Sequence, residues 1–133
     1  MPFAVNGQIW GVAVVHQGDP RLVDRTGAAR LAVTDPATRT VYLSSELEPP
    51  LLDQVALHEA AHVVAIAGGM LAPMRALVPS EYWVPVEEWA AKVVEMGGIE
   101  AVRVATEILG RDVCVRGLCV DKPGNGAARD KRG

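Results

Sequence analysis

The stretch that decides the fold is Leu51–Ala67, LLDQVALHEAAHVVAIA. It is apolar on nearly every face, which predicts a buried helix. Between Val55 and Ala67 the only polar side chains are His58, Glu59 and His62. Residues four apart lie one turn apart on the same helix face, so the two imidazoles project side by side. This HExxH spacing is typical of two histidines that bind one metal ion, with the intervening glutamate free to act as general base.

The alternative for these histidines is a packing role in a purely structural protein. A single histidine in an apolar helix is usually a core residue with a carbonyl partner. Burying three ionisable groups in one apolar segment, however, is costly unless each is paired or bound to a metal. We therefore predict a Zn²⁺ site held by His58 and His62, with Glu59 as the catalytic base. The structural alternative predicts no stoichiometric zinc.

The composition is that of one small domain. The chain has 133 residues, 50% of them hydrophobic, which suits one domain and is too short for two. We expect a single domain over residues 1–121. Residues 122–133 are polar, glycine-rich and without apolar periodicity, so we expect a disordered C-terminal tail there. The net charge of −3 argues against a nucleic-acid partner.

The N-terminal sequence has neither a basic segment nor an apolar core of the kind found in signal peptides. The richest apolar run, within Leu51–Ala67, is interrupted by ionisable residues and is too short to cross a membrane. We therefore expect a cytoplasmic protein without a membrane partner.

The sequence before the Leu51–Ala67 helix predicts a small sheet. Three segments are rich in β-branched residues and are bounded by turn signals: Gln8–His16, Ala29–Thr34 and Arg39–Leu43. We expect the second and third to form a hairpin within an antiparallel sheet. With the helices expected after it, this predicts an α+β fold.

The sequence after Ala67 predicts two further helices. The segment Met70–Trp83 contains two prolines and is interpreted as a loop. One helix is expected over Pro85–Glu95, ending at a pair of glycines, and another over Ile99–Leu109. A short hairpin is predicted within Asp112–Asp121.

The two cysteines, Cys114 and Cys119, lie in this last hairpin. If Arg116 and Gly117 form its two-residue turn, the cysteines face each other across the strands. In a reducing cytosol we favour two free thiols, and a labile disulfide is left open.

A catalytic zinc site needs a third protein ligand and an open position. The sequence lacks the third histidine of the met-zincins. The third ligand is therefore expected to be a carboxylate from the segments after Ala67. There are four candidates: Glu81, Glu87, Glu88 and Glu95. Glu87 neighbours alanines on the apolar side of its helix, so it is our predicted ligand, with Glu88 second. Glu88, Lys92 and Glu95 are expected to share a solvated face. For either glutamate the alternative is an ordinary surface residue in a first helical turn.

The order of a strand hairpin, a VYLS strand, the HEAAH helix and a later E-x-x-A helix resembles the ImmA/IrrE-type minimal metallopeptidases of bacteria, phages and mobile elements. The resemblance covers roughly residues 30–94. It includes Glu87–Ala90 as the E-x-x-A element, whereas Val93 and Val94 stand where the family has Phe and Ala. The resemblance implies a minimal zincin-like fold of the gluzincin type and zinc-dependent hydrolysis of peptide bonds.

Under this interpretation the partner is a protein or peptide substrate, including the case of one dedicated regulator. Tyr82 is a candidate for stabilising the oxyanion, followed by Tyr42 and His16. The edge of the Arg39–Leu43 strand is expected to bind an extended peptide by strand addition. The alternative function is a zinc-binding regulatory or interaction module with little or no turnover.

Overall fold

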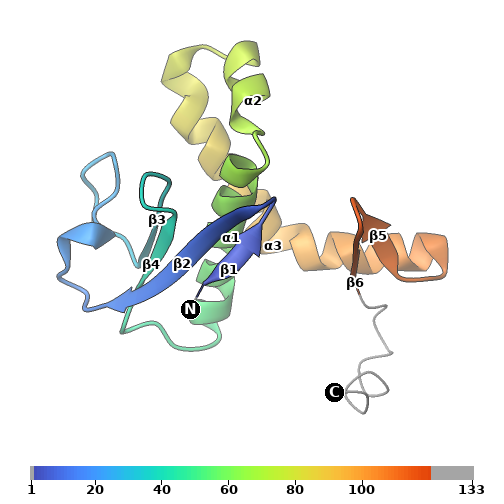
Figure 1. The fold of residues 1–133 in the computed structure, drawn as a ribbon, viewed down its shortest axis with the longest axis horizontal. Helices are drawn as coiled ribbons and strands as arrows, with labels where there is room; N and C mark the ends of the chain where they lie inside the picture. The colour runs from blue at the N-terminus through green and yellow to red at the C-terminus, as the bar shows by residue number, and fades with distance from the viewer. Residues whose placement is uncertain (1, 121–133) are drawn as a thin grey trace. The chain divides into compact units, whose positions relative to one another are not determined.

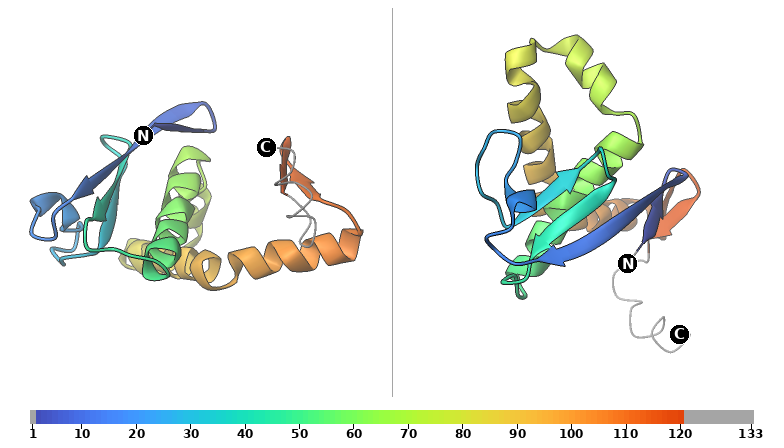
Figure 2. Two further views of the ribbon diagram at one scale, coloured as in Figure 1. Left: turned by 90° about the horizontal axis from the view of Figure 1, so that it is seen from below. Right: turned by 60° about the vertical axis from the view of Figure 1, so that its left-hand side comes forward.

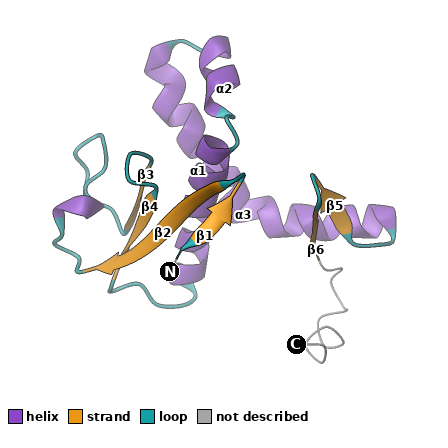
Figure 3. Cartoon of the chain, viewed as in Figure 1, coloured by secondary structure: helices purple, strands orange, loops and turns teal. Residues whose placement is uncertain are grey.

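The computed structural model describes residues 2–120 of the chain. The fold is α+β, as predicted, with a small sheet first and helices after it (Figures 1 and 3). The chain divides into two compact units, residues 1–95 and residues from 96 onward. The single domain expected over residues 1–121 stays a prediction, and the tail expected at residues 122–133 lies outside the described residues.

The first unit contains a four-stranded sheet with the order β1-β2-β4-β3. Its strands are β1 (Phe3–Val5), β2 (Gln8–Val15), β3 (Ala32–Asp35) and β4 (Thr40–Ser44). β1 and β2 form a hairpin around Asn6 and Gly7, both of which have positive φ. Asn-Gly is the residue pair that two-residue hairpin turns favour, so the sequence carries a signal for this hairpin, although the predicted strands do not include β1.

The sheet is mixed, and the prediction of an antiparallel sheet is wrong on this point. β3 and β4 form the expected antiparallel hairpin, but β4 runs parallel to β2. The reason is the connection after β2, which includes the short helix η1 (Pro20–Leu22) and takes the chain to the outer edge before β3 begins. β4 then returns between β2 and β3. On this side of the sheet the edge strand is therefore β3, and the prediction of an exposed edge on Arg39–Leu43 is also wrong.

The helix α1 (Leu51–Ala67) has the predicted bounds. It lies beside the sheet (Figure 2), and Val63 packs there with Trp10 and Val41 as the buried apolar cluster. In the strand register Thr34 is the partner of Val41, which turns Thr34 toward the helix-covered face. This register matters for the site because it brings a hydroxyl to α1.

The segment predicted as a loop contains two short helices, α2 (Leu71–Leu77) and η2 (Ser80–Tyr82). Pro73 does not prevent α2, because it is the third residue and a first-turn N–H needs no partner within the helix.

The two helices expected over Pro85–Glu95 and Ile99–Leu109 are one continuous helix, α3 (Trp83–Leu109). Neither Gly97 nor Gly98 has positive φ, so neither ends the helix, and each costs only about 1 kcal/mol of helix propensity. Gly110, with φ of 71°, follows the last helical residue, and glycine is the residue that this left-handed conformation favours.

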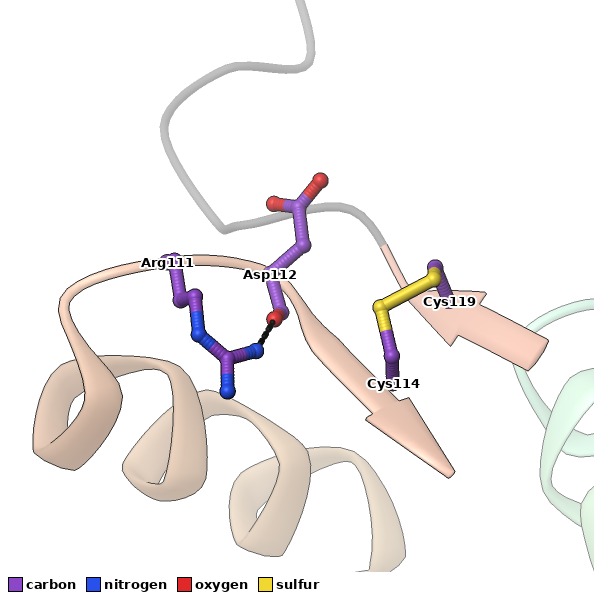
Figure 4. The surroundings of a disulfide bond; sticks show 4 residues. All are labelled: Arg111, Asp112, Cys114 and Cys119. Carbon is purple, nitrogen blue, oxygen red and sulfur yellow. Dashed lines mark hydrogen bonds between the residues drawn. A yellow bond between two sulfur atoms is a disulfide. The ribbon is translucent and has the colours of Figure 1, made fainter. Parts of the chain in front are cut away.

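The second unit contains the end of α3 and the predicted hairpin of β5 (Val113–Val115) and β6 (Leu118–Val120). Arg116 and Gly117 both have positive φ and form the two-residue turn. Cys114 and Cys119 are cross-strand partners and are joined by a disulfide, shown in Figure 4. The preference for free thiols was therefore wrong, since the predicted hairpin register itself brings the two sulfurs together.

Within residues 2–120 no individual helix has the length and apolar character needed to cross a membrane. Taken as a pair, α1 and α2 are long and apolar enough, although they are bent by 84° where they join.

Candidate metal centre

The two histidines of α1 lie side by side, as their spacing predicts. Their ring centroids are 5.1 Å apart and the ring planes are inclined by 62°. His62 is buried and His58 is partly buried. The helix therefore presents four imidazole nitrogens to neighbouring side chains, and the chemistry of the site depends on what each nitrogen faces.

The neighbouring side chains are three glutamates from α3. Glu87, Glu88 and Glu95 all lie within hydrogen-bonding or ion-pairing distance of the histidines. Ala91, which lies between them on the same side of the helix, is buried. The side of α3 that carries Glu88 and Glu95 was expected to face solvent; instead it is turned toward α1.

The Nε2 atoms of both histidines face one carboxylate, that of Glu88. His58 Nε2 lies 3.2 Å from Glu88 Oε2, and His62 Nε2 lies 3.2 Å from Glu88 Oε1. One ligand atom from each of these three residues can be chosen so that all lie within 4.8 Å of one another. Ligands placed 2.0–2.1 Å from a tetrahedral Zn²⁺ are ~3.3 Å apart, so the donor types and the two nitrogen–oxygen distances of 3.2 Å fit that ion.

The Nδ1 atoms face the other two carboxylates. His58 Nδ1 is 3.0 Å from Glu95 Oε1, and His62 Nδ1 is 3.2 Å from Glu87 Oε2. The geometry therefore favours Glu88, the second of our two candidates, as the third ligand. Glu87 is present at the site, but on the opposite edge of a histidine ring.

Both of these outer carboxylates have further partners. Glu87 also binds the guanidinium of Arg25, from the segment before β3. Glu95 also accepts hydrogen bonds from Gln54 Nε2 at 2.7 Å and from Lys92 Nζ at 3.0 Å. Each buried carboxylate is thus close to a cation as well as to an imidazole, which offsets the cost of its burial.

These contacts shift the pKa values of the pair formed by His62 and Glu87. Burial opposes the charged form of His62, but the hydrogen bond to Glu87 and the nearby carboxylates outweigh it and raise the pKa of His62. The same hydrogen bond, acting with Arg25, lowers the pKa of Glu87. The hydrogen bonds from Gln54 and Lys92 likewise lower the pKa of Glu95. Both outer carboxylates are therefore held in the ionised form.

Glu59 lies apart from these contacts, on the side of α1 that faces the sheet. It is only 6% exposed, and Thr34 Oγ1 donates a hydrogen bond of 3.0 Å to its Oε1. Burial raises the pKa of the Glu59 carboxyl, and this effect outweighs the opposing influence of His62 and Thr34. A carboxylate with a raised pKa beside a candidate metal site has the properties required of a general base.

The site opens into a cavity of about 780 Å³ in the first unit. The two histidines and four glutamates of the site all line it: His58, Glu59, His62, Glu87, Glu88 and Glu95. The edge strand β3 forms another wall, together with Arg25 and Arg75. The cavity is large enough for a short extended peptide segment beside the histidines.

The structure does not bring every candidate residue to this cavity. Tyr82 is 52% exposed in η2 and is not among the described residues that line the cavity, and neither is His16. Tyr42 does line it, with the Arg21 guanidinium over its ring. The role of Tyr82 in stabilising an oxyanion stays a prediction without a contact to support it.

Two residues of the site, Thr34 and Arg25, were missed by sequence reasoning. Glu95 was one of the four candidate ligands and was placed on the same helix face as Glu88, but that face was expected to be solvated. Strand alternation could have predicted that Thr34 faces α1 only if the register of the sheet had been known. Arg25 contacts a residue 62 positions away along the chain and has no local signal.

Comparison of this chain with protein-family models, with curated proteins and with solved structures found no match. The resemblance to ImmA/IrrE-type metallopeptidases therefore stays a prediction from the sequence.

Proposed function

We propose that this protein is a zinc-dependent peptide hydrolase, with His58, His62 and Glu88 as the metal ligands and Glu59 as the general base. The observation that carries the proposal is the convergence of two imidazole Nε2 atoms on one carboxylate, with a second, buried carboxylate on the same helix as the histidines. Two histidines and one carboxylate are the protein ligands of many catalytic zinc sites.

The chemistry divides between the ion and the chain. When bound, Zn²⁺ would supply Lewis acidity, lowering the pKa of a water molecule and polarising a carbonyl group. Glu59 would take the proton of the attacking water on its second carboxylate oxygen and pass it to the leaving amine. Thr34 holds the first oxygen and so fixes the orientation of the carboxylate.

The edge strand β3 offers a way to bind the substrate. It ends the sheet order, and its residues line the cavity beside the histidines. An extended peptide that pairs with β3 would lie along the wall of the cavity that also holds Thr34. The substrate class we propose is therefore an extended protein or peptide segment. A cytoplasmic location remains part of this proposal.

The test is the zinc content of the purified full chain, measured by elemental analysis after dialysis, together with cleavage of a mixed peptide library. We expect one zinc per wild-type chain. We expect His62→Ala and Glu88→Ala to lose it, and Glu87→Ala to retain more zinc than Glu88→Ala. A wild-type chain without stoichiometric zinc would overturn the proposal. Zinc retained by Glu88→Ala but lost by Glu87→Ala would restore Glu87 as the third ligand.

A further inference from the structure

Each histidine of the site is bracketed by glutamates of α3, one on each edge of the ring. Glu88 faces the Nε2 edge of both rings, whereas Glu95 faces Nδ1 of His58 and Glu87 faces Nδ1 of His62. Only one of the three carboxylates is shared by the two histidines. The nitrogen atoms that converge are therefore the Nε2 pair, and the two Nδ1 atoms point to separate acids.

A neutral imidazole carries its proton on one nitrogen only, and the other nitrogen is then free to bind a metal. A carboxylate next to Nδ1 favours the tautomer with the proton on Nδ1, because an ionised carboxylate only accepts hydrogen bonds. This tautomer leaves the lone pair of Nε2 directed toward Glu88. Glu88 lies about as close to the Nε2 atoms, but its side chain is 47% exposed, whereas those of Glu87 and Glu95 are 8% and 7% exposed. Because a hydrogen bond is stronger where water is excluded, the two buried carboxylates are the stronger acceptors and favour the proton on Nδ1.

We propose that Glu87 and Glu95 are positioning residues that hold His62 and His58 as Nδ1–H tautomers, with both Nε2 atoms available to one metal ion. The proposal rests on the proposed function for the identity of the metal site, but it assigns Glu87 a different role from the ligand expected from the sequence. It also assigns a role to Glu95, which sequence reasoning placed on a solvated face.

The surroundings of the two carboxylates support a fixed position. The side chains of Glu87 and Glu95 are 8% and 7% exposed, and each also binds a cation that is itself half exposed, Arg25 or Lys92. Gln54, one turn before His58 on α1, donates a further hydrogen bond to Glu95. Replacing either glutamate by glutamine leaves its cation in contact with water rather than buried and unpaired, so both variants are expected to fold.

The first experiment measures Zn²⁺ affinity by chelator competition for the full-length wild type, Glu87→Gln and Glu95→Gln. The matched control is Glu100→Gln, since Glu100 is on the same helix and forms an ion pair with Arg103. We expect Glu87→Gln and Glu95→Gln to weaken zinc binding about 10- to 100-fold, and the control to bind as the wild type does. Zinc affinities equal to the control in both variants would overturn the positioning role while leaving the zinc site intact.

The second experiment reads the tautomers directly, in metal-free protein, from long-range ¹H–¹⁵N NMR spectra of the imidazoles at a pH where both are neutral. We expect Nδ1–H for both rings in the wild type. We expect Glu87→Gln to alter His62 alone and Glu95→Gln to alter His58 alone. An Nε2–H tautomer at either ring of the wild type would overturn the inference. Because this measurement needs no metal, it separates failure of the positioning role from failure of the zinc site.

Discussion

Replacing Glu59 by glutamine separates the catalytic role of this residue from its structural role. Glutamine has nearly the same shape, and its carbonyl oxygen can still accept the 3.0 Å hydrogen bond from Thr34. It cannot take a proton from water. We therefore expect Glu59→Gln to fold, to bind zinc as the wild type does, and to lose peptide hydrolysis.

The expected loss of activity follows from the role of the base. General-base catalysis contributes roughly 10²- to 10⁴-fold to a rate, which corresponds to about 3–5 kcal/mol of barrier. The assay is the initial rate of cleavage of a fluorogenic peptide taken from the library that the wild type cleaves. The control is Glu48→Gln, at an exposed acid just before α1, which should leave the rate unchanged.

The same substitution should stabilise the metal-free protein near neutral pH. Burial raises the pKa of Glu59, so the folded state binds its proton more readily than the unfolded state does. Ionised Glu59 consequently opposes folding. This opposition is absent below the unfolded pKa of about 4.3, grows as the pH rises and levels off above the folded pKa. The stability difference between Glu59→Gln and the wild type should follow that course in chemical denaturation.

Three results would contradict this assignment of Glu59. Hydrolysis by Glu59→Gln at the wild-type rate would exclude Glu59 as the base. Loss of zinc from the variant would indicate that Glu59 is a ligand. If the wild type cleaves no peptide and Glu59→Gln still binds every partner that the wild type binds, the result would favour the zinc-binding module over the enzyme.

Further predictions concern the fold around the site. Val63→Ala should lower the free energy of unfolding by about 2–3 kcal/mol, because Val63 is only 2% exposed in the core. Val64 is 45% exposed, so Val64→Ala should lower it by less than about 1 kcal/mol. Equal losses for the two variants in urea denaturation would contradict the packing described. Asp24 accepts hydrogen bonds from Thr26, Arg30 and two backbone N–H groups, which hold the pKa of its carboxyl well below the usual value. Its stabilising effect should therefore be present above about pH 4 and fade as the pH falls further, so the stability difference between the wild type and Asp24→Asn should shrink in acid; a constant difference would refute the assignment. Reducing the disulfide between Cys114 and Cys119, which are five positions apart, should destabilise the hairpin by about 2 kcal/mol of loop-closure entropy and speed its amide exchange, and unchanged exchange rates would contradict this.

Much of the local structure could be predicted because it depends on neighbouring residues. The apolar run of Leu51–Ala67 predicted α1 with its bounds, and its spacing predicted that His58 and His62 lie together. The Arg116-Gly117 turn predicted the last hairpin and the cross-strand positions of its cysteines, although not their disulfide. In each case the controlling physics, helix periodicity or turn geometry, acts over a few residues.

The arrangement of the strands could not be predicted in the same way. Alternation of apolar residues is the same in parallel and antiparallel strands, so the segments carry no sign that β4 runs parallel to β2. Likewise, the glycine pair in α3 weakens a helix by only a small amount, and the surrounding hydrogen bonds carry the helix through it.

What the sequence by itself determined was the pair of imidazoles and the carboxylate between them, because a single helix places all three. Which acids of α3 meet those imidazoles, and on which edge, was decided only by the tertiary structure. Glu87, Glu88 and Glu95 all lie on one half of the helix, so the rotation of α3 about its axis selects their partners. Arg25 and Thr34 reach the site from segments distant in sequence, and only the packing of the sheet against α1 brings them there.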